Sequence, residues 1–455
     1  MSENLRALLY LFAAVAFVVG LKRLSSPRTA RNGNAIAAAG MLLAIAVTLI
    51  DRGVSWGVIA AGVAVGAGVG AVAALRVKMT AMPQMVALFN GFGGLASSLV
   101  AGAEFLRSDA AALPVETMTS MVLSVVIGAV TFTGSVVAFA KLQEILHGAP
   151  LTYRGQRPVN LAVAAAMLGL GAWALATNLA LPFWVAGAVA LLLGVLVVLP
   201  IGGADMPVVI TLLNSLSGMA AAATGFVISN SALIIAGALV GASGVILTNI
   251  MCRAMNRSLG NVLFGAFGGT VGAAAGAGGS ARATGADDVA IALAYSSQVM
   301  IVPGYGLAVA QAQHALRALT ANLEKRGVRV IYGIHPVAGR MPGHMNVLLA
   351  EVDVPYDQLF DLEQSNAVME RTDVALVVGA NDVVNPAARD DQSSPIYGMP
   401  IIEVDRARST VVIKRSLASG FAGIDNPLFY KDGTAMLFAD AKKALTDLLT
   451  AMAAV

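Results

Sequence analysis

The chain has 455 residues, a length that allows two or three domains. Hydrophobic residues make up 57% of it and charged residues 12%, whereas a soluble domain carries about 25% charged residues, so a wholly soluble protein is excluded. The single cysteine, Cys252, excludes a disulfide framework and a cysteine-based metal site, and we expect no metal. The net charge of +3 says little, because topology decides where the basic residues of a membrane chain lie.

Nine apolar runs fill the first part of the chain, each close to the roughly 20 residues that a membrane-spanning helix needs. They lie at about 5–21, 33–50, 55–75, 83–106, 118–140, 159–179, 182–201, 206–229 and 231–251. No basic region and no cleavage site accompany the first run, so we expect a retained helix rather than a signal peptide. The sequence therefore predicts a polytopic α-helical membrane bundle.

Basic residues favour one set of alternate loops. Three lie on one side, namely Arg6, Arg52 and Arg107. Eleven lie on the other side, namely Lys22, Arg23, Arg28, Arg31, Arg76, Lys78, Lys141, Arg154, Arg157, Arg253 and Arg257. Because cytoplasmic loops are rich in Lys and Arg, we expect the N-terminus outside and the C-terminal part in the cytoplasm.

Two of the runs repeat a pattern. Each begins with Met-Pro, at 82–83 and 206–207, and reaches an asparagine eight residues after the Met, Asn90 and Asn214. At 1.5 Å per residue each asparagine lies about 12 Å along its helix, inside the hydrocarbon. Such a residue either serves an ion pathway or bonds a neighbouring helix, and both interpretations stay open. Acidic residues lie only near span ends, Asp205 among them. A proton would therefore need water held by the two asparagines, or a titratable group from another subunit.

From about residue 287 the pattern becomes that of a soluble α/β domain, with strands and helices in alternation. Strands are predicted at Gln298–Pro303, Arg329–His335, Asp373–Gly379, Pro400–Asp405 and Ser409–Lys414, and helices at Leu307–Arg326, Tyr356–Met369 and Ala439–Met452. This alternation predicts a doubly wound parallel sheet of the Rossmann-like type.

The first of these strands runs into a dinucleotide fingerprint, Gly-Tyr-Gly-Leu-Ala-Val-Ala at 304–310. Gly304 would allow the tight turn, Gly306 would let the backbone approach a pyrophosphate, and Ala310 would let the helix pack closely. The strand before it and the helix after it make a nucleotide site the favoured interpretation.

The charges near strand ends bear on which dinucleotide binds. The second strand ends in His335–Arg340, with no carboxylate to hold a ribose 2′-hydroxyl. Arg340, or the Lys-Arg-Ser at 414–416, could instead pair with a 2′-phosphate. We infer NADP rather than NAD, and the alternative is that these are solvated surface charges.

Gly-Ala-Asn-Asp at 379–382 lies at the carboxyl end of a strand, where open α/β sheets bind ligands. Asn381 could bond a carboxamide. Asp382 could report the cofactor state by titrating, or could simply cap the helix at Pro386. The stretch Gly420–Thr434 would form a lid, or an ordinary loop anchored in the core.

These patterns divide the chain into a membrane domain at 1–257, a Gly/Ala-rich linker at 258–286 and a nucleotide-binding domain at 287–455. The linker is either a passive tether or a hinge. The chain carries no second fingerprint, so a second nucleotide would have to come from a partner.

In all these features the chain resembles the beta subunit of the proton-translocating NAD(P) transhydrogenase (nicotinamide nucleotide transhydrogenase). The motifs that carry the resemblance are the two Met-Pro…Asn helices, 202–207, 251–258, 304–306, 335–343, 379–382 and 414–416. The resemblance implies hydride transfer from NADH to NADP⁺, coupled to proton translocation into the cytoplasm across a cell inner membrane. It also implies an alpha subunit, of one chain or two, with the NAD(H) site and further membrane helices, in a dimer of the alpha–beta unit without nucleic acid.

In the resembling family NADP(H) lies reversed on the fold, so its 2′-phosphate would go to 414–416 and the 335–342 loop would serve another part of the cofactor. Asn381 and Asp382 would lie near the nicotinamide, with Asp382 linking protonation to cofactor release. The full set of expected cofactor-binding residues is Gly304, Tyr305, Gly306, Val337, Ala338, Gly339, Arg340, Met341, Pro342, Gly379, Ala380, Asn381, Asp382, Val383, Met399, Lys414, Arg415, Ser416, Gly420, Phe421, Asp440 and Ala441.

The expected proton pathway includes Asn90, Asn214 and Asp205. The resembling family often has His at the position of Asn90, so we expect an alpha-subunit helix to supply the titrating group. The alternative function is a membrane transporter or channel gated by a regulatory, non-catalytic nucleotide-binding domain.

Overall fold

The computed structural model describes residues 2–24, 26–51, 56–77, 81–108, 113–146, 150–264, 280–394, 396–420 and 422–455. The chain forms two compact units. One comprises Met1–Gly202 and Val208–Thr248, and the other comprises Gly203–Pro207 and Asn249–Val455.

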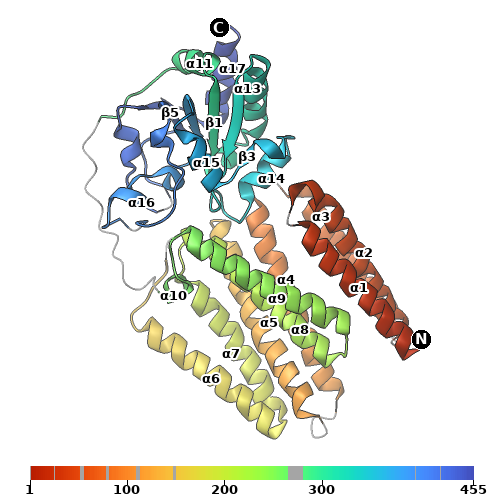
Figure 1. Cartoon of the computed structure of the whole chain (residues 1–455). Coiled ribbons are helices and arrows are strands. Elements are labelled where there is room, and N and C mark those ends of the chain that lie inside the picture. Colours follow the sequence, from red (N-terminus) through yellow and green to blue (C-terminus); the bar gives the residue numbers. More distant parts are fainter. Residues whose placement is uncertain are drawn as a thin grey trace. The chain divides into compact units, whose positions relative to one another are not determined.

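Nine helices in the described part of the chain are long and apolar enough to cross a membrane, as the sequence predicts. They are α1 (Glu3–Leu24), α2 (Pro27–Asp51), α3 (Trp56–Arg76), α4 (Met82–Arg107), α5 (Val115–Leu142), α6 (Gln156–Thr177), α7 (Ala180–Val198), α8 (Met206–Val227) and α9 (Ser231–Ala254) (Figure 1). Many of their large apolar side chains are exposed, as lipid-facing side chains must be.

Glycines let neighbouring helices of the bundle pack backbone against backbone. A Cβ on Gly128 of α5 would lie 2.4 Å from the carbonyl oxygen of Gly94 in α4. A Cβ on Gly218 of α8 would lie 2.5 Å from the backbone nitrogen of Gly241 in α9. Small residues at such crossings are typical of membrane helix pairs. The two Met-Pro…Asn helices therefore each cross the next helix in the chain at a glycine.

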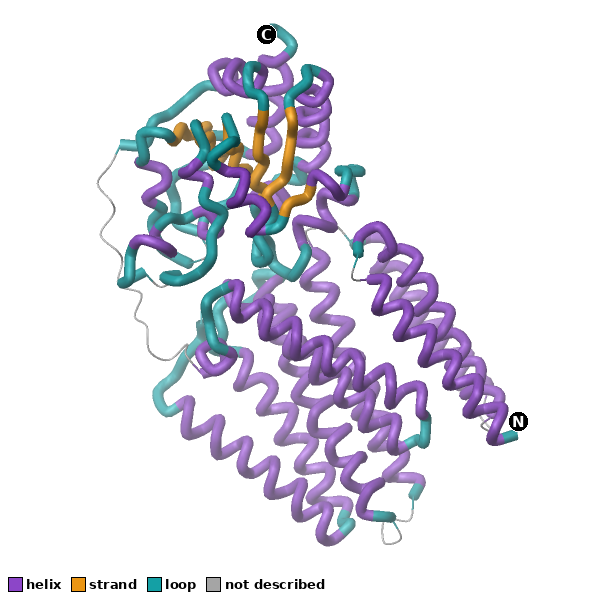
Figure 2. The backbone as a smooth tube through the Cα atoms, viewed as in Figure 1, coloured by secondary structure: helices purple, strands orange, loops and turns teal. Residues whose placement is uncertain are grey.

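The α/β domain contains six parallel strands in the order β3-β2-β1-β4-β5-β6 (Figures 1 and 2). Its strands are β1 (Gln298–Pro303), β2 (Arg329–Gly333), β3 (Leu359–Phe360), β4 (Val374–Val378), β5 (Ser409–Lys414) and β6 (Thr434–Phe438). Its helices of five or more residues are α11 (Ala286–Ala294), α12 (Tyr305–Val309), α13 (Gln313–Lys325), α14 (His344–Ala350), α15 (Leu362–Met369) and α17 (Ala441–Met452), and α10 (Leu259–Phe264) precedes them. The predicted doubly wound parallel sheet is confirmed.

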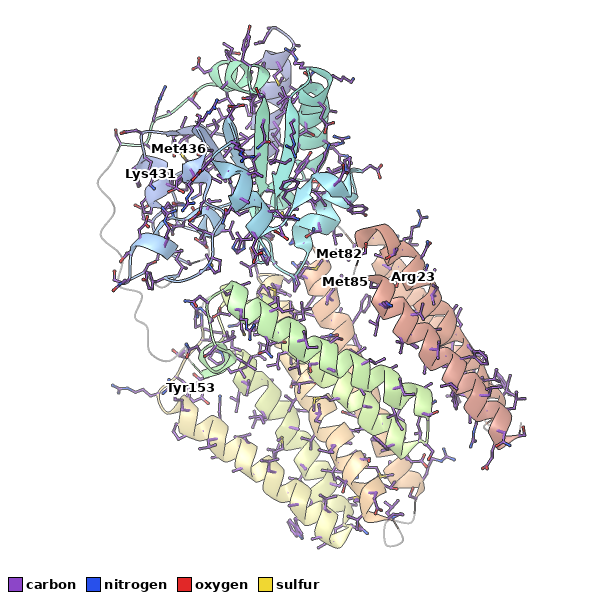
Figure 3. The ribbon with its side chains drawn as sticks, in the orientation of Figure 1. Arg23, Met82, Met85, Tyr153, Lys431 and Met436 are labelled. Carbon is purple, nitrogen blue, oxygen red and sulfur yellow. The ribbon has the colours of Figure 1, made fainter. Side chains whose placement is uncertain are left out.

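The core of this domain lies on both faces of the sheet. Met300 and Val302 join one cluster with Phe429, while Val299 and Ile301 alternate with them along β1, and all are buried. Burial on both faces is typical of parallel sheets and explains the continuous apolar strands. Helices α11, α13 and α17 pack together, whereas α15 contacts β2 and β3. Figure 3 shows the side chains, with Met436 of β6 labelled.

Several predicted boundaries are wrong. Residues 400–405 form no strand, and the single helix expected at 307–326 is two helices, because Gln311 between them adopts φ +49°. The helix expected at 356–369 contains a 3₁₀ turn and β3 before α15 begins. The short elements β6, α11 and α14 were not predicted.

The segment expected to be a linker is partly structured. It contains α10, and Ala283 near its end pairs with Met436 at the edge of β6. The Gly-rich residues 265–279 lie outside the described residues.

Candidate functional site

The candidate site begins where β1 and β4 end, which is the point at which the strand order reverses. Gly304 N–H donates to the Val378 carbonyl over 2.9 Å, and Gly306 N–H donates to the Gly379 carbonyl over 2.9 Å. A Cβ on Gly304 would lie 2.4 Å from the Ala380 Cα. The predicted glycines therefore let two loops touch at the position where doubly wound sheets bind nucleotides.

The loop after β2 reaches the fingerprint. The Arg340 guanidinium carbon lies 4.3 Å from the centre of the Tyr305 ring, a cation–π contact. Arg340 N–H donates to His344 Nδ1 over 3.0 Å. Gly339, at φ +107°, has no room for a Cβ, which would lie 2.6 Å from His344. Arg340 is thus held beside Tyr305, and the Gly339–His344 contact fixes its backbone.

His335 anchors this loop from inside the domain, where it is 2% exposed. Its Nε2 lies 2.7 Å from the Pro400 carbonyl oxygen, so Nε2 carries the proton, and Nδ1 accepts from Val337 N–H over 3.2 Å. Burial lowers the pKa of His335 to about 4, and the bond to Pro400 only partly opposes that change. His335 is therefore neutral at ordinary pH, and its hydrogen bonds hold the loop in place.

Asn381 and Asp382 follow β4 and bond each other. Asn381 Nδ2 donates to one Asp382 oxygen over 3.1 Å, and Ala422 N–H donates to the other over 3.0 Å. Asp382 does not cap the helix after Pro386, because Asn385 Oδ1 accepts the Ala387 N–H there over 3.0 Å. The capping alternative is wrong, and the Asp382 carboxylate instead accepts hydrogen bonds from Asn381 and from the Ala422 backbone.

Lys414, the last residue of β5, points toward the same group. Its Nζ lies 3.4 Å from Asn381 Oδ1 and 4.9 Å from the centre of the Phe429 ring, and it also donates to the Ala418 carbonyl. Burial lowers the pKa of Lys414, while the charges of Asp382 and Asp425 oppose that change. The ammonium is thus held at the strand end by the Asn381 amide oxygen and the Ala418 carbonyl, beside the Phe429 ring.

The stretch predicted as a lid or an ordinary anchored loop, Gly420–Thr434, contacts Asn381 and Asp382 at its start and the core at its end. At its start, Gly420 packs so closely that a Cβ would lie 2.3 Å from Asn381 Nδ2 and 2.6 Å from an Asp382 oxygen. At its end, Leu428 and Phe429 are buried in the core. Gly420 therefore lies against Asn381 and Asp382, and Leu428 and Phe429 fix the stretch to the domain. Phe421 lies outside the described residues.

Asn426 joins Asn381 to the buried end of this stretch, although no sequence pattern predicted it. It is 1% exposed, and its Nδ2 donates to the Asn381 carbonyl over 3.0 Å. Its Oδ1 accepts the Leu428 N–H over 3.0 Å. An Asn before a Pro is an ordinary turn signal, so only the tertiary contact identifies it.

Arg415 and Ser416 follow Lys414 directly and are exposed. In the described part of the chain no carboxylate forms an ion pair with Arg415. The hydroxyl oxygen of Ser416 accepts the Ala418 N–H over 3.4 Å. A cation and a hydroxyl thus stand at the end of β5 with capacity for an anion.

Asp440 and Ala441 lie next to the end of β5. Ala439 N–H donates to the Lys414 carbonyl over 3.2 Å, and Asp440 caps α17 by accepting the Lys442 N–H over 3.0 Å.

Met399 and Val383 lie farther along the same loops. Met399 precedes Pro400, the partner of His335, and lines an open hollow of about 470 Å³ with Tyr397. Val383 accepts the Ile402 N–H over 2.9 Å.

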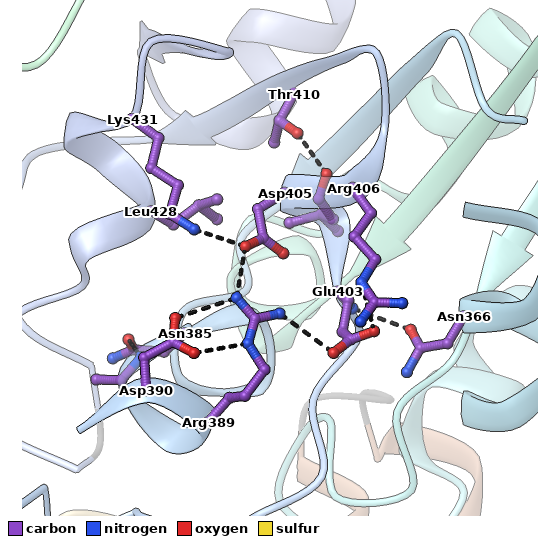
Figure 4. A network of polar contacts seen from close by, with 12 residues as sticks. Asn366, Asn385, Arg389, Asp390, Glu403, Asp405, Arg406, Thr410, Leu428 and Lys431 are labelled. Carbon is purple, nitrogen blue, oxygen red and sulfur yellow. Dashed lines mark hydrogen bonds and ion pairs between the residues drawn. The ribbon is translucent and has the colours of Figure 1, made fainter. Parts of the chain in front are cut away.

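Arg389 illustrates the opposite situation, a cation fully used within the chain (Figure 4). Its guanidinium pairs with Asp390 at 2.8 Å, Glu403 at 3.1 Å and Asp405 at 2.9 Å. Lys431 pairs with Asp405 at 2.6 Å. Burial raises the pKa of Asp405, but hydrogen bonds from Arg389 and Lys431 outweigh it, and the pKa falls below its ordinary value. This network has a structural role.

In the membrane bundle, Ser217 connects the two repeated asparagines. Its hydroxyl lies 2.5 Å from Asn90 Oδ1 and 2.9 Å from the Asn214 carbonyl oxygen. Asn90 Nδ2 is buried without a protein partner, and so is Ser135 Oγ. A Cβ on Gly91, the residue after Asn90, would lie 3.0 Å from the Ser135 Cβ, so α4 and α5 pack closely at this level. Asn90 therefore bonds another helix and also keeps hydrogen-bonding capacity for a small ligand.

A second polar cluster in the bundle is satisfied by protein atoms. The Ser124 and Thr224 hydroxyls lie 2.6 Å apart. Ser124 also lies 3.1 Å from the Ser97 carbonyl oxygen, and Thr224 lies 2.9 Å from that of Ala220. These hydroxyls join helices.

Asp205, just before α8, forms an ion pair with Arg257 at 3.1 Å. Its other oxygen is buried without a protein partner. Burial raises the pKa of Asp205, and Arg257 opposes that change. Among the described residues no group of three His, Cys, Asp or Glu side chains could hold a metal ion.

Comparisons with known proteins find similarity over nearly the whole length of the chain. Residues 6–451 match the family model described as NAD(P) transhydrogenase beta subunit. The chain is similar to a Rhodospirillum rubrum protein named NAD(P) transhydrogenase subunit beta, with 50% identity over an alignment of 465 residues. The alignment covers 99% of this chain and 100% of that relative. A relative of the same name from a strain of that species has the same identity and coverage.

Proposed function

The chain belongs to the NAD(P) transhydrogenase beta subunit family, and we propose that it binds NADP(H) in its α/β domain and exchanges hydride with NAD(H) on a partner alpha subunit. The membrane bundle couples this exchange to proton translocation into the cytoplasm. In the forward direction NADH reduces NADP⁺. The family assignment and the geometry at the carboxyl edge of the sheet support this proposal.

The observation that carries the NADP(H) assignment is the contrast between two arginines. Arg389 is neutralised by three carboxylates, whereas no described carboxylate forms an ion pair with Arg415 at the end of β5. A 2′-phosphate is the part of NADP that NAD lacks, and a guanidinium binds it strongly. Gly304 and Gly306, whose Cβ positions are taken by the backbone of residues 379–380, let two loops meet at the place where doubly wound sheets bind a pyrophosphate.

When bound, the nicotinamide ring supplies the hydride chemistry. The chain's part is to bind, orient and exclude water. Asn381 offers an amide to orient a carboxamide, and the segment with Gly420 and Ala422 lies against Asp382. Protonation of Asp382 would weaken the carboxylate's bonds to Asn381 and Ala422. That change would loosen the segment and favour release of the nucleotide, a population shift.

For the proton, we propose that Asn90, Asn214 and Asp205 line the pathway. The Asn90 amide nitrogen and the Ser135 hydroxyl are buried without a hydrogen-bond partner, and each favours a bound water molecule. By contrast, the hydroxyls of the Ser124 cluster have protein partners. Neither group titrates, so the titrating residue would come from an alpha-subunit helix beside Asn90 and Asn214. Burial makes Asp205 a group that binds a proton more readily than an ordinary aspartate.

The proposal includes the topology and the assembly. Residues 1–257 would span the inner membrane with the N-terminus outside, 258–286 would act as a hinge, and 287–455 would face the cytoplasm. The alpha subunit, in one chain or two, would add the NAD(H) site and further helices, and two alpha–beta units would form a dimer.

Proteoliposomes that contain the full chain and its alpha subunit test the function. NADH and NADP⁺ are supplied to outward-facing α/β domains, and a proton gradient is imposed in either direction. The proposal expects NADPH formation to accelerate when protons flow toward the side of these domains, and to slow when the gradient is reversed. Equal rates under both gradients would refute the coupling, and no hydride exchange at all would favour the gated transporter.

A further inference from the structure

The region where α5 and α7 end and α6 begins contains a second group of buried polar side chains. Lys141, in the last turn of α5, is 3% exposed, and its ammonium lies 2.5 Å from the Leu199 carbonyl oxygen and 2.7 Å from that of Ile201. Asn160 of α6 donates its Nδ2 to the Leu196 carbonyl over 3.2 Å. The partly negative carboxyl end of α7 is therefore held by a cation and an amide from two neighbouring helices.

Gln156 lies beside this arrangement without a partner. It is the first residue of α6 and stands one turn before Asn160, so both side chains share a face of the helix. Helices α6 and α7 are joined by residues 178–179 and pack antiparallel. Asn160 of α6 lies level with Leu196 of α7. Because the two helices run in opposite directions, Gln156, one turn before Asn160, lies level with the residues one turn after Leu196, whose carbonyls Lys141 binds.

Three amide atoms in this group have no hydrogen-bond partner in the protein. They are Oε1 and Nε2 of Gln156, which is 2% exposed, and Oδ1 of Asn160. The Asn160 amide is not reversed, because its oxygen would then face the Leu196 carbonyl oxygen. Since all three atoms are buried, lipid, bulk solvent and a partner subunit cannot reach them.

The unsatisfied atoms define the ligand that fits. Two are acceptors and one is a donor, so the ligand must donate two hydrogen bonds and accept one. A water molecule does this. A metal cation would leave the Nε2 donor unsatisfied and would lie near the Lys141 ammonium, and a halide has no hydrogen to donate. We propose that Gln156 and Asn160 bind an internal water molecule that links the start of α6 to the Lys141-capped end of α7.

This site shares no residue with the proposed proton pathway, and the proposal does not depend on that pathway. The test is radiolytic hydroxyl labelling of the full chain with its alpha subunit in lipid nanodiscs, read by mass spectrometry. A bound water generates radicals in place, so Val198, Pro200 and Ile201 should be labelled although they are buried. Gln156→Met, which keeps the side-chain size, should reduce that labelling at least several-fold. Thr177→Val, at the other end of α6, is the control and should leave it unchanged.

Absence of labelling at Val198, Pro200 and Ile201 in the unsubstituted protein would overturn the proposal, as would equal labelling of these residues in Gln156→Met. An electron cryomicroscopy map that resolves waters gives an independent reading. Density within hydrogen-bond distance of Gln156 and Asn160 is expected. A Gln156 amide bonded to protein atoms, or density at the shorter distances of a metal ion, would contradict it.

Discussion

Gly306 and Gly379 meet backbone to backbone, and a Cβ on Gly306 would lie 2.7 Å from the Gly379 Cα. Gly379 also adopts φ +67°, which disfavours any side chain there. This contact joins the loops after β1 and β4, and the Gly306 N–H donates to the Gly379 carbonyl over 2.9 Å within it.

Gly306→Ala should therefore damage both stability and nucleotide binding. Overpacking at such a contact costs about 1–3 kcal/mol, and the shifted loop should weaken NADPH binding as well. Thermal unfolding and fluorescence titration of the full chain in nanodiscs measure the two effects. Gly433→Ala, where a Cβ meets nothing within 4 Å, is the control. Unchanged NADPH affinity in Gly306→Ala would argue against a phosphate cradle here.

Arg415→Gln tests the proposed 2′-phosphate site. Loss of one charge-assisted hydrogen bond should weaken NADPH binding about 10- to 100-fold, while NADH binding should change little. Arg408→Gln provides a matched control, because that exposed arginine pairs with Asp373 at the opposite end of the sheet. If NADPH and NADH lose affinity equally, Arg415 does not read the 2′-phosphate.

His335 should make the α/β domain sensitive to acid. Its pKa falls from 6.5 unfolded to about 4 folded, so between these values the unfolded chain binds more protons and stability declines as the pH falls. The full effect is about 3 kcal/mol, present above pH 6.5 and lost near pH 4. Unfolding temperatures at several pH values should show a shallower decline in His335→Gln than in the exposed-site control His314→Gln. Identical slopes would mean that other groups dominate.

Asn90→Leu should separate proton coupling from nucleotide binding. Its unpartnered amide lies in the membrane, so the substitution should reduce gradient-driven NADPH formation and leave NADPH affinity unchanged. Ser217→Ala removes one interhelical bond and should cost about 0.6–1.7 kcal/mol of stability. Proteoliposome assays and unfolding curves measure these outcomes, with the exposed Ser120→Ala as control. Full coupling in Asn90→Leu would remove this residue from the pathway.

Arg257→Gln should move the pH dependence of coupling. Arg257 opposes the rise in the pKa of Asp205, so its removal lets that pKa rise further and shifts the profile toward higher pH. Asp205→Asn should remove the shift in the double variant. A profile that moves toward lower pH would contradict this assignment.

The spans were predictable because each apolar run alone is long enough for the membrane. The glycine fingerprint was predictable because it directly follows a buried strand. By contrast, 400–405 looks like a strand, yet its backbone groups bond elsewhere. Ile402 N–H donates to Val383, while the amide of Asn366 bonds Ile401 and Glu403. No local pattern contains such tertiary partners.

The same limit applies to the candidate site. Asn381, Asp382 and Lys414 were identified from their places at strand ends, where a parallel sheet gathers side chains. Asn426 and the Ala422 N–H were not, because each acts through a contact about 40 residues away in sequence.

Titrating the full chain in nanodiscs with NADPH and with NADH decides whether this chain is the NADP(H)-binding half of the enzyme. NADPH should bind more tightly by about two orders of magnitude or more, as expected for a paired phosphate, and Arg415→Gln should remove most of that preference. Equal affinities, or tighter binding of NADH, would contradict that role.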